Sequence, residues 1–199
     1  MAQAVSHHEH HHHEDHESLK VLGFWIFLVT DCLLFGTLFA TYAVLYTHAN
    51  PGQTGKELFE VPVFVAETFI LLTSSFTSGL ATLAMHKGKL KSLIGWLIVT
   101  ALLGLAFVGL EIDEFIKLAH EGATISASAF LSAFFTLVGT HGLHVSIGLI
   151  WMVAIMIQLG RYGINEVTKR KVTIIGLYWH FLDVVWIFLF TVVYLLGVM

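Results

Sequence analysis

The chain has 199 residues, of which 56% are hydrophobic and only 12% are charged. Soluble domains carry about 25% charged residues, so this chain has too few polar side chains to cover a water-soluble fold. The composition therefore indicates a membrane protein, in agreement with a mean hydropathy of +0.80. The net charge is -4, and no basic surface remains that could bind nucleic acid. A single cysteine, Cys32, excludes an internal disulfide and a cluster of thiolate ligands.

The first twenty residues form a polar, histidine-rich segment. Residues 1–20 lack the apolar stretch and the cleavage site of a signal peptide, so we predict a disordered tail in the cytoplasm. Its imidazoles could bind Zn²⁺ or Cu²⁺ only weakly, because nothing rigid holds them in a defined geometry. The histidines concerned are His7, His8, His10, His11, His12 and His13.

Five long apolar stretches follow this tail. Each is long enough to cross a hydrocarbon layer of ~30 Å as an α-helix that rises about 1.5 Å per residue. Helices are expected because the backbone polar groups of a span in lipid must find partners within the protein. The sequence therefore predicts an all-α integral membrane domain over 21–199, a bundle of five transmembrane helices at about residues 21–46, 62–85, 93–112, 129–158 and 172–198.

The positions of the basic residues predict an orientation. Eight of the ten Lys and Arg residues precede the first span or lie in the connections after the second and fourth spans, and only Lys56 and Lys117 lie on the opposite side. The positive-inside rule then places the N-terminus in the cytoplasm and the C-terminus in the periplasm. The spans show no internal repeat, which argues against a transporter built from inverted repeats.

Seven ionisable residues lie within the predicted spans. Each costs on the order of 3 kcal/mol at the centre of a helix in lipid, so such residues normally face the bundle interior, pair or serve a function. Counting the helical rise places Asp31, His144, His180 and Asp183 at ~12 to ~20 Å from the cytoplasmic ends, in one central layer. The seven residues are Asp31, Glu67, Glu111, His141, His144, His180 and Asp183.

Three interpretations of these residues stay open: a hydrogen-bond network that holds the helices together, a role with protons or lipid headgroups, and ligation of a metal or haem. A metal needs three or four convergent donors, and a haem needs two opposed ligands. His141 and His144 share one predicted helix and His180 lies on another, which is a weak match. We expect no catalytic, cofactor or metal site in this chain.

Acidic residues also mark the predicted outer boundary. We expect the Glu67 carboxylate to reach the lipid headgroups. Asp113 and Glu114 are expected at a solvated helix end, where Asp113 and Lys117 have the spacing of an i,i+4 ion pair. Glu111 lies on the membrane side of this boundary, and a buried position and a solvated one are equally compatible with the sequence.

Aromatic and small residues give further expectations about packing. Tyr178 and Trp179 lie near a span end and are expected to be interfacial anchors, whereas Trp186 lies deeper and should pack against other helices. Thr100 and Gly104 have the spacing that allows close contact between helices.

Two segments resemble the signature stretches of a known family. The stretch Thr140-His141-Gly142-Leu143-His144-Val145 with Gly148, and the stretch from Tyr178 to Trp186 (YWHFLDVVW), are similar to those of subunit III of haem–copper terminal oxidases. The first span and the stretch from Gly109 to Phe115 also look like this family, so the likeness runs from about residue 20 to the end. Five spans after a histidine-rich tail resemble the quinol-oxidase form rather than the seven-span cytochrome c oxidase form.

The resemblance implies a non-redox accessory subunit of a proton-pumping quinol oxidase in the bacterial inner membrane. It implies oxidase subunits I and II and a small subunit IV as partners, with the haem and copper in subunit I. The chain would bind phospholipid but no cofactor, and would support assembly and proton uptake by subunit I. Asp31 matches a position where many relatives carry a buried glutamate that reacts with carbodiimides, and the shorter side chain leaves that reactivity open.

Two other functions are also compatible with the residues. The first is a stand-alone proton-coupled transporter that uses Asp31, Glu67 and Asp183 as carriers, for which broken helices would be expected. The second is a small b-type cytochrome with His144 and His180 as haem ligands.

Overall fold

The computed structural model describes residues 2–46 and 61–195, and side chains at 19, 21–46 and 62–194. Lys56, residues 196–198 of the fifth predicted span and the side chains of the tail histidines lie outside this described part. The described residues form helices joined by turns and include no strand. The elements are α1 (Ala2–Leu45), α3 (Val61–His86), α4 (Leu90–His120), α5 (Ala129–Tyr162), α6 (Glu166–Leu189) and the π-helix η2 (Phe190–Leu195).

Five helices are long and apolar enough to cross a membrane, which confirms the predicted all-α class with five spans. Their bounds differ from the predicted ones mainly where charged residues occur. Helix α4 continues to His120, and α6 begins at Glu166 rather than near residue 172. A span predicted from hydrophobicity ends at the first charged residue. The helix itself continues, because its backbone hydrogen bonds persist where the charged side chains reach water or a partner. The orientation of the termini stays a prediction.

The start of α6 is fixed by a capping box. The side chain of Asn165 accepts a hydrogen bond from the backbone N–H of Thr168 at 2.9 Å, and the Thr168 hydroxyl accepts one from the backbone N–H of Asn165 at 2.8 Å. These two bonds satisfy N–H groups that a helix start otherwise leaves without partners. They explain why the helix begins several residues before the apolar stretch.

The chain divides into two compact units, Met1–Gly36 and Thr37–Met199, and α1 runs through the boundary. In the first unit the helix begins at Ala2, so its backbone includes the histidine-rich residues for which the sequence predicts a disordered tail. A helix that is already nucleated in a span can extend without a new nucleation cost. Disorder of the tail in water stays a prediction.

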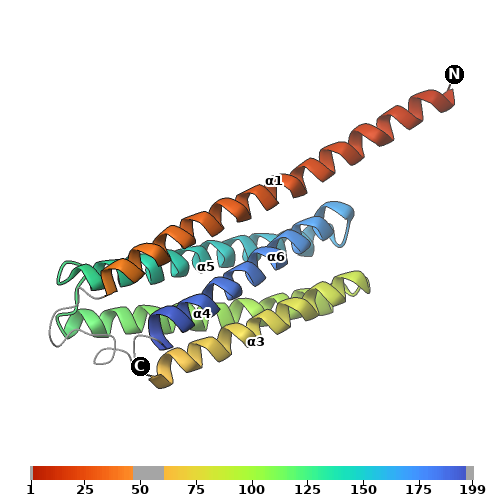
Figure 1. Ribbon diagram of the computed structural model, residues 1–199. Coiled ribbons are helices and arrows are strands. Elements are labelled where there is room, and N and C mark those ends of the chain that lie inside the picture. Colours follow the sequence, from red (N-terminus) through yellow and green to blue (C-terminus); the bar gives the residue numbers. More distant parts are fainter. Residues whose placement is uncertain (1, 47–60, 196–199) are drawn as a thin grey trace. The chain divides into compact units, whose positions relative to one another are not determined.

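The second unit contains a four-helix arrangement in which α3, α4, α5 and α6 lie side by side (Figure 1). Helix α3 packs against α4 and α6, and α5 packs against the same two helices. The turns after α3 and α5 contain Gly88 (φ +66°) and Gly163 (φ +65°), in a left-handed conformation that suits glycine. Short connections of this kind make consecutive helices antiparallel.

Aromatic rings fill the interior of this second unit. Phe107 and Trp186 meet edge to face with ring centroids 4.7 Å apart, and Phe64 and Tyr194 lie 4.9 Å apart. Trp186 is buried, which confirms its predicted packing against other helices. Trp179 is only 1% exposed, so its predicted role as an interfacial anchor is wrong.

Tyr178 is 3% exposed, and the expectation that it anchors at the interface is wrong as well. Distance from a span end indicates how deep a residue lies along the helix, but it does not say whether the ring faces lipid or protein.

Candidate functional site

Helix α6 donates two hydrogen bonds from buried indoles to hydroxyl groups of α3. Trp179 Nε1 donates to Ser74 Oγ at 3.0 Å, and Trp186 Nε1 donates to Thr68 Oγ1 at 3.0 Å. An indole has one donor and no acceptor, so a single hydroxyl satisfies it within an apolar core. The two bonds fix the contact of α6 with α3.

Two tyrosines extend these cross-links to the other helices. Tyr178 donates from its hydroxyl to the backbone carbonyl of His144 on α5 at 3.1 Å. Tyr194, in η2, donates to Glu114 Oε2 on α4 at 3.1 Å. The fifth span is therefore hydrogen-bonded to α3, α4 and α5.

Small residues bring α4 close to its neighbours, as the spacing of Thr100 and Gly104 predicts. A Cβ at Gly104 would lie 2.7 Å from the Trp179 ring and 2.9 Å from Leu149. Thr100 Oγ1 and Thr77 Oγ1 share a hydrogen bond at 2.8 Å. Hydrogen bonds and small residues of this kind hold helices together in lipid, where the hydrophobic effect does not.

Three acids are buried between the helices. Glu67 is 0% exposed, Glu111 3% and Glu114 8%. The expectation that Glu67 reaches the headgroups is wrong, and so is the solvated position of Glu114. Both side chains lie near the predicted boundary but on helix faces that point into the bundle. Asp113 does form the predicted ion pair with Lys117, at 2.9 Å on the exposed side of α4.

The three acids lie near one another. Glu67 on α3 interacts electrostatically with Glu111 and Glu114 on α4. The Glu111 carboxyl packs directly onto the backbone of α5, where a Cβ at Gly142 would overlap both of its oxygens. Sequence reasoning did not identify Gly142 or Tyr194 as partners of these acids. In the sequence, the only feature that marks Gly142 is its position between His141 and His144 in a predicted span.

His141 and His144 lie on α5 in different surroundings. The His141 ring is buried beside Phe107 and Trp186, with ring centroids 5.9 Å and 5.4 Å away. His144 is half-buried, and its Nδ1 donates to the backbone carbonyl of Thr140 at 2.7 Å.

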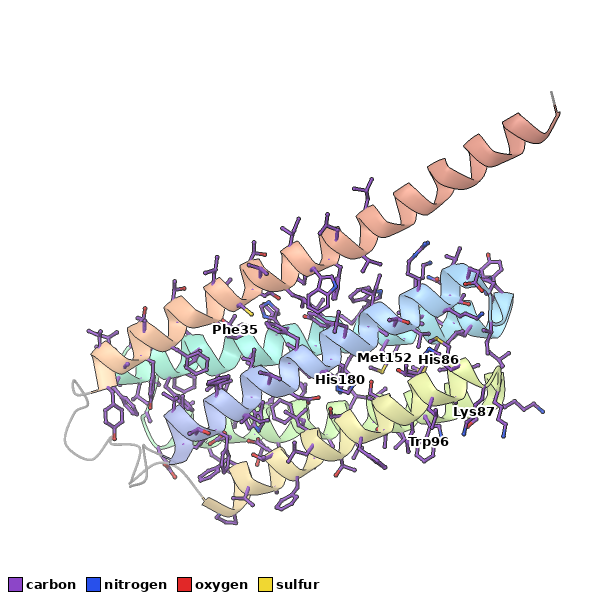
Figure 2. All side chains as sticks on the ribbon, turned by 45° about the vertical axis from the view of Figure 1, so that its right-hand side comes forward. Phe35, His86, Lys87, Trp96, Met152 and His180 are labelled. Carbon is purple, nitrogen blue, oxygen red and sulfur yellow. The ribbon has the colours of Figure 1, made fainter. Side chains whose placement is uncertain are left out.

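His180 and Asp183 form a second polar group, with Ser75 of α3. Ser75 Oγ and His180 Nδ1 share a hydrogen bond at 2.7 Å, and His180 Nδ1 lies 3.9 Å from Asp183 Oδ2. Asp183 is buried and the His180 side chain is half-exposed. Figure 2 shows His180 part-way along the bundle, between the end with His86 and Lys87 and the end where α6 finishes.

The structure places several of the seven predicted residues in separate groups. In the second unit, Glu67 and Glu111 belong to one group and His180 and Asp183 to another. Asp31 lies on α1 in the first unit, so its surroundings among the other helices stay a prediction. Among the described residues, no group of three or more His, Cys, Asp or Glu side chains is arranged to hold a metal ion.

Five spans and polar side chains buried between helices define a multi-pass helical membrane protein. The sequence model of the family cytochrome c oxidase subunit III matches residues 1–198. The chain belongs to this family, which confirms the resemblance seen in its signature stretches.

Several relatives match most of the chain. It is 53% identical over 190 residues to the cytochrome bo(3) ubiquinol oxidase subunit 3 of Pseudomonas aeruginosa, covering 96% of this chain and 91% of the relative. It is 54% identical over 179 residues to the quinol oxidase subunit 3 of Bacillus subtilis, with coverages of 90% and 88%. A probable quinol oxidase subunit 3 of Staphylococcus saprophyticus is 48% identical over 184 residues, covering 92% of each chain.

Proposed function

We propose that this chain is subunit III of a haem–copper quinol oxidase in the bacterial inner membrane, an accessory subunit without a redox centre of its own. The observation that carries this proposal is the match of the family over residues 1–198, together with relatives at about half identity that are named quinol oxidase subunit 3. A match of this length includes all five spans.

The buried polar groups suit an accessory role. The indoles of α6 donate hydrogen bonds to hydroxyl groups of α3, as in a bundle whose polar side chains serve packing. The electron carriers, haem and copper, would then belong to subunit I. Subunit II and a small subunit IV complete the proposed complex, in which this chain supports assembly and proton uptake by subunit I.

Lipid is the other proposed partner of this chain. Many large apolar side chains are exposed along the helices, among them Phe69, Phe76 and Ile150. Side chains of this kind are compatible with acyl chains or with the apolar face of another subunit. Phospholipid bound at such a surface would hold this subunit against the rest of the complex.

Copurification tests the proposed assembly. The tagged chain, expressed together with its genomic neighbours and solubilised in mild detergent, is expected to bring down a larger haem protein and quinol oxidase activity. The chain expressed alone is the control, and it should show neither haem absorbance nor oxidase activity. The proposal fails if the coexpressed chain never associates with a haem protein.

The same preparations distinguish the two alternatives. A Soret band from the chain purified alone would favour the b-type cytochrome with His144 and His180 as ligands. Proton-coupled uptake by the isolated chain in liposomes would favour the transporter.

A further inference from the structure

Glu67 and Glu111 are buried acids, and three of their four carboxyl oxygens have no hydrogen-bond partner among the described residues. Within residues 61–195, both carboxyl oxygens of Glu67 and Oε1 of Glu111 make no hydrogen bond and belong to no ion pair. Buried polar atoms are almost always bonded, either to protein or to an ordered water molecule. Within the described part, these three oxygens therefore still need a partner, which internal water or a proton shared between neighbouring carboxyl groups would supply.

Among residues 61–195, the surroundings of the Glu67/Glu111 pair supply no lysine or arginine. The titratable groups that the described part places around it are Glu114 of α4, Tyr194 of η2 and His141 of α5. The Tyr194 hydroxyl donates a hydrogen bond to Glu114, and the His141 ring packs against the rings of Phe107 and Trp186. None of these groups is a lysine or an arginine that could neutralise a carboxylate.

The fold leaves space for this pair at a specific place. Gly142 is the residue of α5 that faces Glu111, and any Cβ there would occupy the position of the carboxyl oxygens. At the same level α6 changes into the π-helix η2, whose Tyr194 reaches inward to Glu114. Short π-helical segments are often found at functional sites, because they redirect side chains at some cost in helix stability.

We propose that Glu67 and Glu111 form an enclosed proton-binding site, in which the two carboxyl groups and internal water share at least one proton. Two carboxylates enclosed without a cation would repel each other and would both lose their hydration, at a cost far above that of a lost hydrogen bond. A bound proton removes one charge and creates an O–H donor. The other carboxyl group or a water molecule then accepts that hydrogen bond.

This site goes beyond the accessory role proposed above, because it assigns a ligand to residues within this chain. The ligand is the proton itself, together with water. The site requires only the folded chain, so its failure and the failure of the proposed assembly are separate results.

Infrared spectroscopy tests the proposal on the full chain, purified near neutral pH with whatever partners accompany it. The C=O stretching band of a protonated carboxyl group is distinct from the bands of a carboxylate and of an amide. We expect the wild-type protein to show this band, and the double variant Glu67→Gln/Glu111→Gln to lose the part that belongs to the pair. Glu166→Gln is the matched control, since Glu166 is exposed and paired with Lys169, and it should leave the band unchanged.

A band that is unchanged in the double variant overturns the proposal, and so does its absence from the wild-type protein. If the variants do not fold, isotopically labelled glutamate in the wild-type chain shows whether the band comes from glutamate. The band should then shift, because its source is glutamate. A band that does not shift belongs to aspartates such as Asp31 or Asp183, and this result would also overturn the proposal.

Discussion

Single glycines determine how closely helices approach in this bundle. Gly104 is covered by the Trp179 ring and Gly142 by the Glu111 carboxyl, whereas Gly109 has no atom of a neighbouring element within 4 Å. Adding the same methyl group at these positions therefore has different consequences, although all three glycines lie in helices. The difference depends on the neighbouring helix and not on local propensity.

The variant Gly142→Ala is expected to destabilise the folded bundle by about 1–3 kcal/mol, because its Cβ overlaps the oxygens of Glu111. The better helix propensity of alanine, worth about 1 kcal/mol, offsets only part of this cost. Unfolding of the purified protein in mixed micelles, followed while the denaturing detergent is increased, measures the difference from wild type.

Gly109→Ala is the control for this variant, since its new Cβ meets open space. Its free energy of unfolding should equal that of the wild type or exceed it by up to about 1 kcal/mol. Equal effects at the two positions would show that Glu111 does not pack on Gly142.

Sequence reasoning at this scale succeeded where spacing alone decides the contact. Asp113 and Lys117 are one helical turn apart, and their ion pair is found on the exposed side of α4. The burial of Glu67 and Glu114 was not predicted, because position along the chain gives depth but not the face of the helix. A carboxyl near a predicted boundary can point to water or into the bundle with equal ease.

Among the elements, α6 has a special role because it provides the donors for its neighbours. Its indoles and phenols bond to α3 and α5, and the adjoining η2 bonds to α4. Together these hydrogen bonds connect the fifth span to α3, α4 and α5.

Replacing Trp179 by Phe should lower the free energy of unfolding by about 1–3 kcal/mol, because the Ser74 hydroxyl loses its indole donor within the core. Trp96→Phe is the matched control, since Trp96 is only half-buried and no indole hydrogen bond is seen for it in the described part. The same detergent unfolding assay compares both variants with wild type. Equal effects would argue against a contribution from the Ser74 bond.

Tyr194→Phe tests the contact made by η2. Phenylalanine keeps the ring packing but removes the donor to Glu114 Oε2, so we expect a loss of stability of about 1–3 kcal/mol. Tyr162, which is 71% exposed at the end of α5, offers the control Tyr162→Phe with no measurable effect. A Tyr194→Phe variant with the stability of the wild type would contradict the inward position of this hydroxyl.

Helices as such were predictable, whereas their ends and irregularities were not. Apolar runs of span length indicate helices because no other structure satisfies the backbone in lipid. The capping box at Asn165 and Thr168 lies outside the apolar run, so hydropathy does not detect it. The change to a π-helix at Phe190 depends on the packing of η2 against α3 and α4, which the local sequence does not reveal.

For the whole molecule, the distribution of basic residues gives a prediction about topology. A phosphatase reporter that is active only outside the cytoplasm should be inactive when inserted after Lys87 and active at the C-terminus. The physical reason is the excess of Lys and Arg in and beside the connections that follow α3 and α5. A fluorescent reporter that folds only in the cytoplasm, placed at the same positions, is the control and should give the opposite pattern. Activity of the phosphatase after Lys87 would reverse the proposed orientation.

The order in which the spans are made gives these cross-links a further consequence. Helices α3, α4 and α5 are synthesised before α6. The hydroxyls of Thr68 and Ser74 therefore enter the membrane before the indoles that bond to them have been translated. An incomplete polypeptide that ends before residue 166 would lack both indole hydrogen bonds and the contacts of α6 that complete the bundle.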